Sequence, residues 1–418
     1  AAAAAAAAPG GARGRPPTSK GLGESFSDEV LTEEFRGCLA RRRPLQVQGP
    51  ASPLLGFFDA DSVVAALALG SESGRTAAYK RGEPCLRESL FLAYLDQASL
   101  NLTEAERFFL PVLTLCQSLA EPFGYVTARL VLNPASLTVR GPPLVSDADL
   151  LLVQLWGEQR SQLRCSAHGL PMTAPRPETL LAPNLQPGDV LYIPSGVECW
   201  SVGGVPDEPV LFMLLTLRSS SHSFEASFAK YLNDLLREGG LSQDNDLFLR
   251  TAVTKHTLPP RGVAEHPAYS KLEAMTGQCA AELASRLSAR GLREHYDQRM
   301  RELRREQEEA AEKMLDSVAG VAPQGHITTR SRVRISTGVI CRCVAGETKA
   351  FFKRGTETLR LDIARSASRL IHALSDGEDH VVESLPCDDP VERISVCQVL
   401  VFKQCLEATG AGTAGPAG

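Results

Sequence analysis

The stretch that decides the fold is Leu185-Gln-Pro-Gly-Asp-Val-Leu-Tyr-Ile-Pro-Ser-Gly-Val-Glu-Cys-Trp200. Its Pro187-Gly188-Asp189 predicts a turn, because proline presets φ, glycine allows positive φ and aspartate can bond nearby backbone. The apolar run 190–193 predicts a short strand. Pro194, Ser195 and Gly196 end this strand with a second turn. Two turns around a four-residue strand are typical of a tight barrel corner.

This string resembles the second half of the barrel in JmjC-type cupins, the fold of 2-oxoglutarate- and Fe(II)-dependent hydroxylases. In that family Pro-Gly-Asp, an apolar strand and Pro-x-Gly precede an iron-binding histidine, and Cys199 occupies that position here. Upstream, residues 149–156 form an apolar run that predicts a buried strand. The run ends in Gln154-Leu-Trp-Gly157, which resembles the Gln-Leu-x-Gly segment of the ribosomal oxygenase branch of the family.

The residues that would carry the family's chemistry are replaced. Counting back from Gly157, the histidine and aspartate of the iron motif fall on Leu144 and Ser146, and the lysine that holds 2-oxoglutarate falls on Gln159. With Cys199, these residues do not supply the two imidazoles and one carboxylate that such iron sites use. We therefore expect a pseudoenzyme that has no catalytic residue and binds neither metal nor cofactor.

The alternative is an active 2-oxoglutarate-dependent protein hydroxylase with a rearranged site, built from Asp147 or Asp149 together with Cys199 and His168. The sequence contains one His-x-Asp, at His295 and Asp297. It lies in a charged segment of helical character, where residues two apart point about 200° away from each other. That pair is therefore not expected to chelate one ion.

Composition and length bound the remaining possibilities. A chain of 418 residues is long enough for two or three domains, and its net charge of −5 gives no nucleic-acid signature for the chain as a whole. The eleven cysteines include no CxxC pair, which is typical of free thiols inside the cell. The basic, acid-free segment before Glu24 favours a mitochondrial location or a plain disordered tail, with the nucleus or nucleolus as the alternative.

The resemblance implies an α+β protein in three parts between two tails. A JmjC-like double-stranded β-helix (cupin) domain is followed by a helical dimerisation domain and a winged-helix-like domain. The predicted boundaries are 1–23 for the first tail, 24–219, 220–318 and 319–408 for the domains, and 409–418 for the last tail. Helices are predicted near 57–69, 90–95, 105–119, 224–235, 266–287, 293–313, 365–374 and 390–407. Strands are predicted at 45–48, 127–132, 149–156, 190–193, 326–329, 332–335, 339–344 and 349–353.

Two predicted helices in the middle of the chain carry apolar stripes. The first has Phe224, Phe228 and Tyr231 at helical spacing. The second has Met300 and Leu303 within a heptad-like pattern that suits packing on a helix of a partner or on its own chain. These residues are the candidates for contact with a second copy or with a larger assembly.

The C-terminal region contains Leu385-Pro-Cys-Asp-Asp-Pro390, which resembles the Leu-Pro-Cys-Asp string of the ribosomal oxygenase winged-helix domain. Its strands are basic and its other segments acidic, so a protein contact and a nucleic-acid contact both remain open. Overall the sequence predicts a structural or interaction subunit of a larger assembly, either ribosome-related or organellar. The basic residues are Arg330, Arg332, Arg334, Arg342, Lys349, Lys353 and Arg354, and the acidic ones are Asp376, Glu378, Asp379, Glu383, Asp388 and Asp389.

Overall fold

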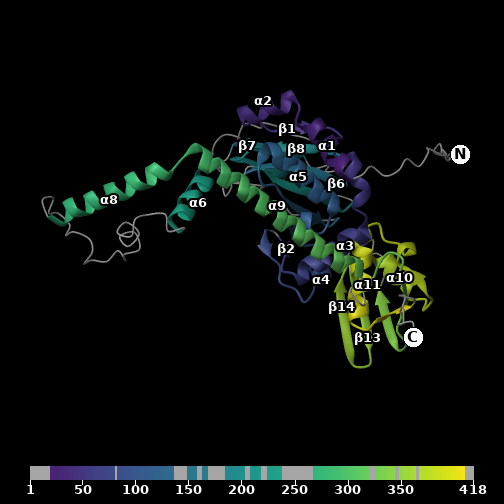
Figure 1. Ribbon diagram of the computed structural model, residues 1–418. Coiled ribbons are helices and arrows are strands. Elements are labelled where there is room, and N and C mark those ends of the chain that lie inside the picture. Colours follow the sequence, from purple (N-terminus) through teal and green to yellow (C-terminus); the bar gives the residue numbers. More distant parts are fainter. Residues whose placement is uncertain are drawn as a thin grey trace, which may run out of the picture.

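The computed structural model describes residues 19–80, 82–135, 148–157, 162–167, 184–202, 208–217, 224–237, 267–320, 326–343, 348–363 and 367–409. Helices and strands are mixed along the chain, and one large antiparallel sheet lies at its centre (Figure 1). None of the helices in these ranges is long and apolar enough to cross a membrane.

The central sheet has eight strands in the order β1-β8-β6-β10-β5-β4-β2-β3, and all neighbours run antiparallel. In that order the strands are β1 (Leu45–Val47), β8 (Val190–Ile193), β6 (Asp149–Trp156), β10 (Val210–Leu217), β5 (Thr127–Asn133), β4 (Ser99–Thr103), β2 (Thr76–Lys80) and β3 (Glu83–Pro84). A separate two-stranded sheet pairs β7 (Gln162–Ala167) with β9 (Val197–Val202). The strands predicted from the apolar runs 149–156 and 190–193 are therefore confirmed.

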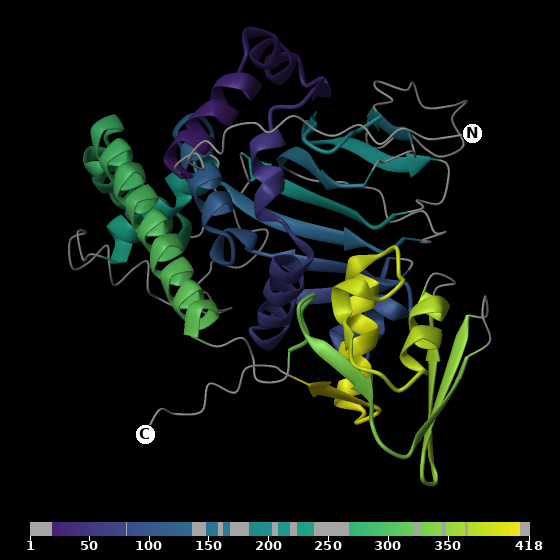
Figure 2. The same cartoon turned by 90° about the vertical axis from the view of Figure 1, so that its right-hand side faces the viewer.

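Helices cover one face of the central sheet (Figure 2). Three of them begin at a side-chain cap, because Thr32, Asp59 and Ser89 each accept a backbone N–H three residues later. The helical elements are α1 (Ser19–Val30), α2 (Glu33–Arg41), the 3₁₀ helix η1 (Ser52–Phe57), α3 (Ala60–Glu72), α4 (Leu90–Leu95), the 3₁₀ helix η2 (Ala105–Arg107) and α5 (Leu110–Phe123). The core between helices and sheet includes Phe35 and Tyr192, whose ring centroids lie 5.1 Å apart.

In the described ranges, three further helices follow β10: α6 (Phe224–Arg237), α8 (Pro267–Arg286) and α9 (Ala289–Gly320). Helix α8 projects away from the body of the molecule (Figure 1). Helix α9 returns along η2 and α5 and reaches the C-terminal domain (Figure 1). The long charged helix predicted around 293–313 is thus confirmed and is longer at both ends.

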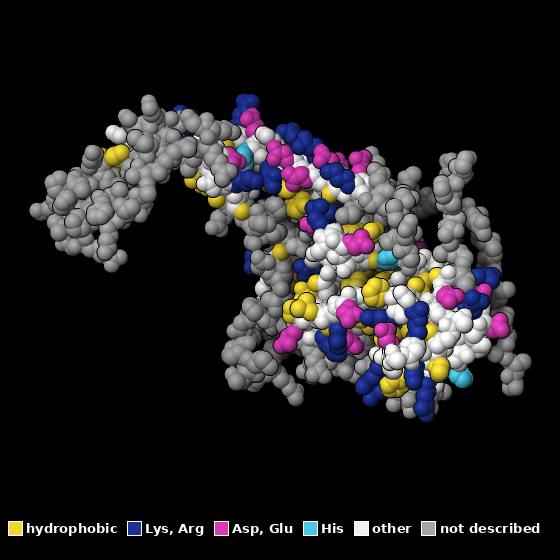
Figure 3. All heavy atoms as spheres, turned by 90° about the horizontal axis from the view of Figure 1, so that it is seen from below, with side chains coloured by type: hydrophobic (Ala, Val, Ile, Leu, Met, Phe, Trp, Pro, Cys, Tyr) yellow, Lys and Arg dark blue, Asp and Glu magenta, His cyan; other side chains and the backbone are white. Residues whose placement is uncertain are grey.

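The residues described between 326 and 409 form two three-stranded sheets and two helices, and we call this part of the chain the C-terminal domain. The first sheet has β11 (Arg332–Ile335) between β15 (His380–Val381) and β16 (Leu406–Thr409), and the second is β12 (Val339–Cys343), β13 (Lys349–Arg354) and β14 (Glu357–Asp362). The helices are α10 (Ala367–Leu374) and α11 (Pro390–Phe402), with a single 3₁₀ turn at Val382–Ser384. Helix α11 packs on α4 and α3 of the N-terminal half. From below, Lys and Arg side chains gather around a few exposed hydrophobic atoms at this end of the molecule (Figure 3).

Three local predictions are corrected by the structure. Residues 326–329 are not a strand: Thr329 donates its N–H and its hydroxyl to the Asp61 carboxylate, and a turn follows. The last helix ends at Phe402, and part of the segment predicted as helical is strand β16 instead. The helix predicted for 105–119 begins only at Leu110, because Pro111 lacks an N–H and suits a first turn.

Candidate functional site

The turn before β8 is a structural joint between distant segments. The Asp189 carboxylate accepts hydrogen bonds from the backbone N–H of Gln186 and of Gly49 and from the side-chain amide of Gln46, each at 3.0 Å. Gly188 adopts φ +95°, and a Cβ there would lie 2.6 Å from Ser52 Oγ. The Pro-Gly-Asp motif therefore fixes β8 against β1 and η1, and this role requires no ligand.

The face of the central sheet that points away from the helices is lined mainly by hydrocarbon side chains, with the buried Gln154 opposite Phe212. Alternate residues of β6, β8 and β10 lie on this face, as the period of two in a strand requires. They form a buried cluster with one residue each from β5, from the turn before β8 and from the start of β9. We call this set the inner layer; its members are Val131, Leu150, Leu152, Leu185, Leu191, Ile193, Val197, Val210, Phe212 and Leu214.

The polar groups of β6 next to this layer are largely engaged in local hydrogen bonds. The Asp149 carboxylate accepts the backbone N–H of Ser195 at 2.8 Å. The amide nitrogen of Gln154 donates to the carbonyl oxygens of Trp156 and Gly157, at 2.7 and 3.0 Å. Asp149 is one of the two acids considered for the alternative metal site. Its hydrogen bond to the turn after β8 gives it a structural role.

Trp156 lies on the helix-covered side of β6, although alternation from Leu150 and Leu152 would place it in the inner layer. The register between β6 and β10 shifts beside Leu211, where β6 contains one extra residue. Such a bulge turns the following side chain to the other face. Trp156 accordingly packs on the helix-covered side and donates its indole N–H to the carbonyl of Phe58 at 2.7 Å.

The positions that correspond to the family's chemistry lie mainly outside the described residues. This applies to Leu144, Ser146, Gln159, Asp147 and His168. Cys199 is in β9, and its backbone is paired with that of Cys165 in β7. Within the described ranges, His, Cys, Asp and Glu form no group of three or more that suits a metal ion.

His295 and Asp297 are separated by the helix, as predicted. His295 Nε2 lies 2.8 Å from Asp234 Oδ2 on α6, whereas Asp297 pairs with Arg293 at 3.0 Å on the surface of α9. The two side chains thus serve different contacts and do not converge on one ion.

The interaction candidates divide into buried and exposed groups. Met300 and Leu303 are buried within the chain, where α9 packs on η2 and α5. Tyr231 is also buried and lies against the His295 ring, with centroids 5.3 Å apart. Phe228 is 37% exposed, and nothing is described of the Phe224 side chain. Met300 and Leu303, in the heptad-like stripe of α9, therefore pack on their own chain.

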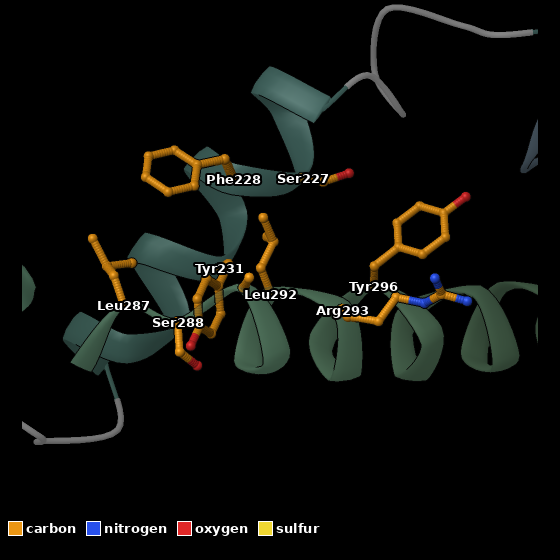
Figure 4. A pocket seen from close by; sticks show the side chains of 9 residues that line it. Ser227, Phe228, Tyr231, Leu287, Ser288, Leu292, Arg293 and Tyr296 are labelled. Carbon is orange, nitrogen blue, oxygen red and sulfur yellow. The ribbon is translucent and has the colours of Figure 1, made fainter. Parts of the chain in front are cut away.

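An open apolar groove of about 580 Å³ lies beside Phe228, between α6 and the junction of α8 with α9 (Figure 4). Its wall is mostly hydrocarbon, with Arg293 and Tyr296 at one end (Figure 4). The lining residues are Ser227, Phe228, Tyr231, Leu287, Ser288, Ala289, Leu292, Arg293 and Tyr296.

The sequence reasoning missed two buried polar contacts that join separate parts of the chain. Tyr94 on α4 donates its hydroxyl to Asp389 at 2.7 Å, and Asp389 also caps α11 by accepting the N–H of Val391 and Glu392. Burial raises the pKa of both Tyr94 and Asp389. The Asp-Pro pair ahead of an apolar run is an N-cap signal that could have identified Asp389 as the cap of this helix.

The second missed contact centres on Glu106, which is 1% exposed. Its carboxylate accepts the N–H of Ala128 at 2.9 Å and the side-chain amide of Gln307 at 3.4 Å. Gln307 also donates to the carbonyl of Val126 at 3.2 Å, so α9 is tied to the sheet through this group. Burial raises the pKa of Glu106 to about 7. No local sequence signal distinguishes this glutamate from the neighbouring Glu104.

Comparisons with known proteins give structural likeness only. The crystal structure of the ribosomal oxygenase YcfD from Escherichia coli is similar over 90% of this chain and 99% of its own, with 14% identity and a TM-score of 0.43. A prolyl-4-hydroxylase from Pseudomonas putida covers 46% of this chain and 98% of its own, with 13% identity and a TM-score of 0.26. A cupin with a double-stranded β-helix from Methanocaldococcus jannaschii covers 22% of this chain and 69% of its own, with 17% identity and a TM-score of 0.16. No protein-family model and no curated protein sequence matches the chain.

Proposed function

We propose that this chain is a non-catalytic JmjC-like protein of the ribosomal oxygenase type, and that it acts as a structural or interaction subunit of a larger assembly. The observation that carries the proposal is the inner layer. Its ten members occupy one face of β6, β8 and β10, and the buried polar side chain that shares this face, Gln154, carries no charge and donates to backbone.

The physical argument concerns the cost of burying charge. A divalent ion and its carboxylate ligand are stable inside a protein only when each is paired, because an unpaired buried charge is strongly unfavourable. Leu144, Ser146 and Cys199 replace all three ligands that the resemblance implies. Replacing the whole ligand set by uncharged groups removes that cost, so the barrel keeps its fold without a metal.

The three-part layout supports the same proposal. We assign the central sheet with β7 and β9 to a double-stranded β-helix and α6, α8 and α9 to a helical dimerisation domain. The two small sheets with α10 and α11 are assigned to a winged helix. The support is their order along the chain and, for the last domain, the string Leu385–Pro390 at the start of α11.

The candidate surface for self-association is the groove beside Phe228. Met300 and Leu303 are excluded from this surface because they are buried in their own chain. A two-fold pair of copies is the commonest form of association, and a ribosome-related or organellar assembly is the alternative.

Metal analysis of protein purified without chelators tests the loss of catalysis. We expect far less than one iron per chain after incubation with Fe(II), and no succinate from 2-oxoglutarate in the presence of ribosomal protein fragments. The triple variant Leu144→His, Ser146→Asp, Cys199→His is the matched positive control, because it restores the implied ligand set. Stoichiometric iron in the unmodified chain, or turnover of 2-oxoglutarate by it, would establish the rearranged hydroxylase instead.

Affinity purification with mass spectrometry, followed by sizing with and without nuclease, tests the binding role. Ribosomal proteins or ribosomal RNA in the same particle are the expected result. A free monomer that co-purifies with neither protein nor RNA would contradict the scaffold proposal. Light scattering of the isolated chain and of Phe228→Asp then separates self-association from docking into a larger particle, since only a dimer that uses the groove loses mass on substitution.

A further inference from the structure

The outer face of the β12–β13–β14 sheet is basic. Alternation along the strands directs Phe352, Leu359 and Leu361 toward the core of the C-terminal domain, where they pack. The side chains between them point outward and are exposed. We call this surface the basic face; it consists of Ile340, Arg342, Lys349, Phe351, Lys353, Thr358 and Arg360, and in the same register Asp362 is opposite Lys349.

An aromatic ring lies at the centre of the basic face. In the strand register Phe351 is directly opposite Arg342 on one side and Arg360 on the other. Directly opposed residues on one face have Cβ atoms about 5 Å apart. Phe351 is 38% exposed and Ile340, which is opposite Lys353, is 67% exposed. Large apolar side chains at these exposures, each beside cations, are not explained by the packing of the chain itself.

The charge of this face is local, because the whole chain has a net charge of −5. On the other small sheet, Arg334 lies near Asp379 and Glu407. On the described strands of the basic face, the register places one acidic residue, Asp362, among four cationic residues. The cations are presented on a sheet that protrudes from the end of the molecule (Figures 1 and 3). Access to an extended ligand is therefore open.

We propose that the basic face binds single-stranded RNA, with a base stacked on Phe351 and phosphates neutralised by the surrounding Arg and Lys side chains. A cationic sheet surface with an exposed aromatic ring is the chemistry that holds unpaired nucleotides without reading their sequence. Duplexes do not offer a free base to the ring, so single strands are favoured. The choice of RNA rests on the proposed function, which places the chain in a ribonucleoprotein assembly, whereas the geometry of the face does not depend on it.

Fluorescence anisotropy with the full chain and a labelled 12-nucleotide RNA of mixed sequence tests the proposal. Four phosphate contacts predict that log K falls with log salt with a slope of roughly −3. Phe351→Ala is expected to weaken binding about tenfold, in the range for loss of one base stack, with little change in that slope. Arg342→Gln with Lys353→Gln removes two cations and is expected to reduce the slope by about half.

Controls distinguish binding at the basic face from nonspecific binding. Arg334→Gln removes an arginine that is ion-paired away from the basic face, and it is expected to bind RNA as the unmodified chain does. Thermal unfolding followed by circular dichroism checks that each variant is folded, which is expected because the substituted side chains are exposed.

Three results would overturn the proposal. One is equal affinity for double-stranded DNA with no effect of Phe351→Ala, which indicates charge alone. Another is preference for single-stranded DNA of the same sequence. The third is binding of polyglutamate but not of RNA, which indicates an acidic protein partner. Because the assay uses the isolated chain and no metal, each of these results is independent of the iron measurement that tests the loss of catalysis.

Discussion

Glu106→Gln should change how the stability of the protein depends on pH. Burial is the main cause that raises the pKa of Glu106 to about 7, and the negative charge of Glu104 adds to it. Hydrogen bonds from Ala128 and Gln307 act in the opposite direction but do not compensate for burial. At neutral pH the folded chain therefore holds a proton that an unfolded chain has already released.

The direction in which the free energy of unfolding changes with pH follows from proton binding. Between pH 4.5 and pH 7 the folded state binds more protons at Glu106 than the unfolded state, so the free energy of unfolding falls as pH rises. The contribution is greatest below pH 4.5 and is lost above pH 7. At about 1.4 kcal/mol per pH unit, the raised pKa corresponds to about 3 kcal/mol. Glutamine resembles the protonated carboxyl and does not titrate, so the variant should lack this decline.

Urea unfolding at pH 5, 6, 7 and 8 measures the effect as the difference between the unmodified chain and Glu106→Gln. This difference should move by about 3 kcal/mol in favour of the variant across the range. Glu83→Gln, at an exposed position on β3, is the matched control and should follow the unmodified chain. A difference that stays constant with pH, or that moves in favour of the unmodified chain at high pH, would refute the reasoning.

Three further substitutions test individual contacts. Tyr94→Phe keeps the ring but removes the donor to buried Asp389, and should lower the free energy of unfolding by about 1–3 kcal/mol in urea titrations; an unchanged midpoint would show that the contact is not made. Gly188→Ala places a Cβ near Ser52 at positive φ, and should cost at least about 1–2 kcal/mol by thermal unfolding; a variant as stable as the parent would exclude that turn geometry. Met300→Ala should destabilise the chain by about 2–5 kcal/mol, because Met300 is buried in its own chain, while the mass by light scattering stays unchanged; loss of mass without loss of stability would instead place Met300 in an interface between copies.

The sequence predicted best those elements whose signal is local. Continuous apolar runs bounded by turn residues gave the strands at 149–156 and 190–193 and the helix at 90–95 with their observed bounds. The apolar character of these segments satisfies burial on both faces, so no distant contact changes the result.

The features that were predicted wrongly depend on contacts with residues that are distant in the sequence. Residues 406 and 407 were predicted as the end of a helix, but pairing with β11 makes 406–409 a strand. Alternation along β6 would place Trp156 on the same face as Leu150 and Leu152, but a bulge opposite β10 turns it to the other face. For the candidate site, the ligand positions that the resemblance implies could be located in the sequence and stay a prediction. The hydrogen-bonding role of Asp149 could not be predicted, because its partner Ser195 is 46 residues away.

The N-terminal sheet and the C-terminal domain contribute to a single hydrophobic cluster, in which Phe35 and Leu151 belong with Leu370 and Ile394. Proteins with separate cores melt in steps, but a shared core couples the loss of one half to the loss of the other. Scanning calorimetry should therefore record one cooperative endotherm for these two regions, with equal calorimetric and van't Hoff enthalpies. It also follows that deleting the C-terminal domain exposes apolar surface on α3 and α4, so such a fragment is expected to aggregate.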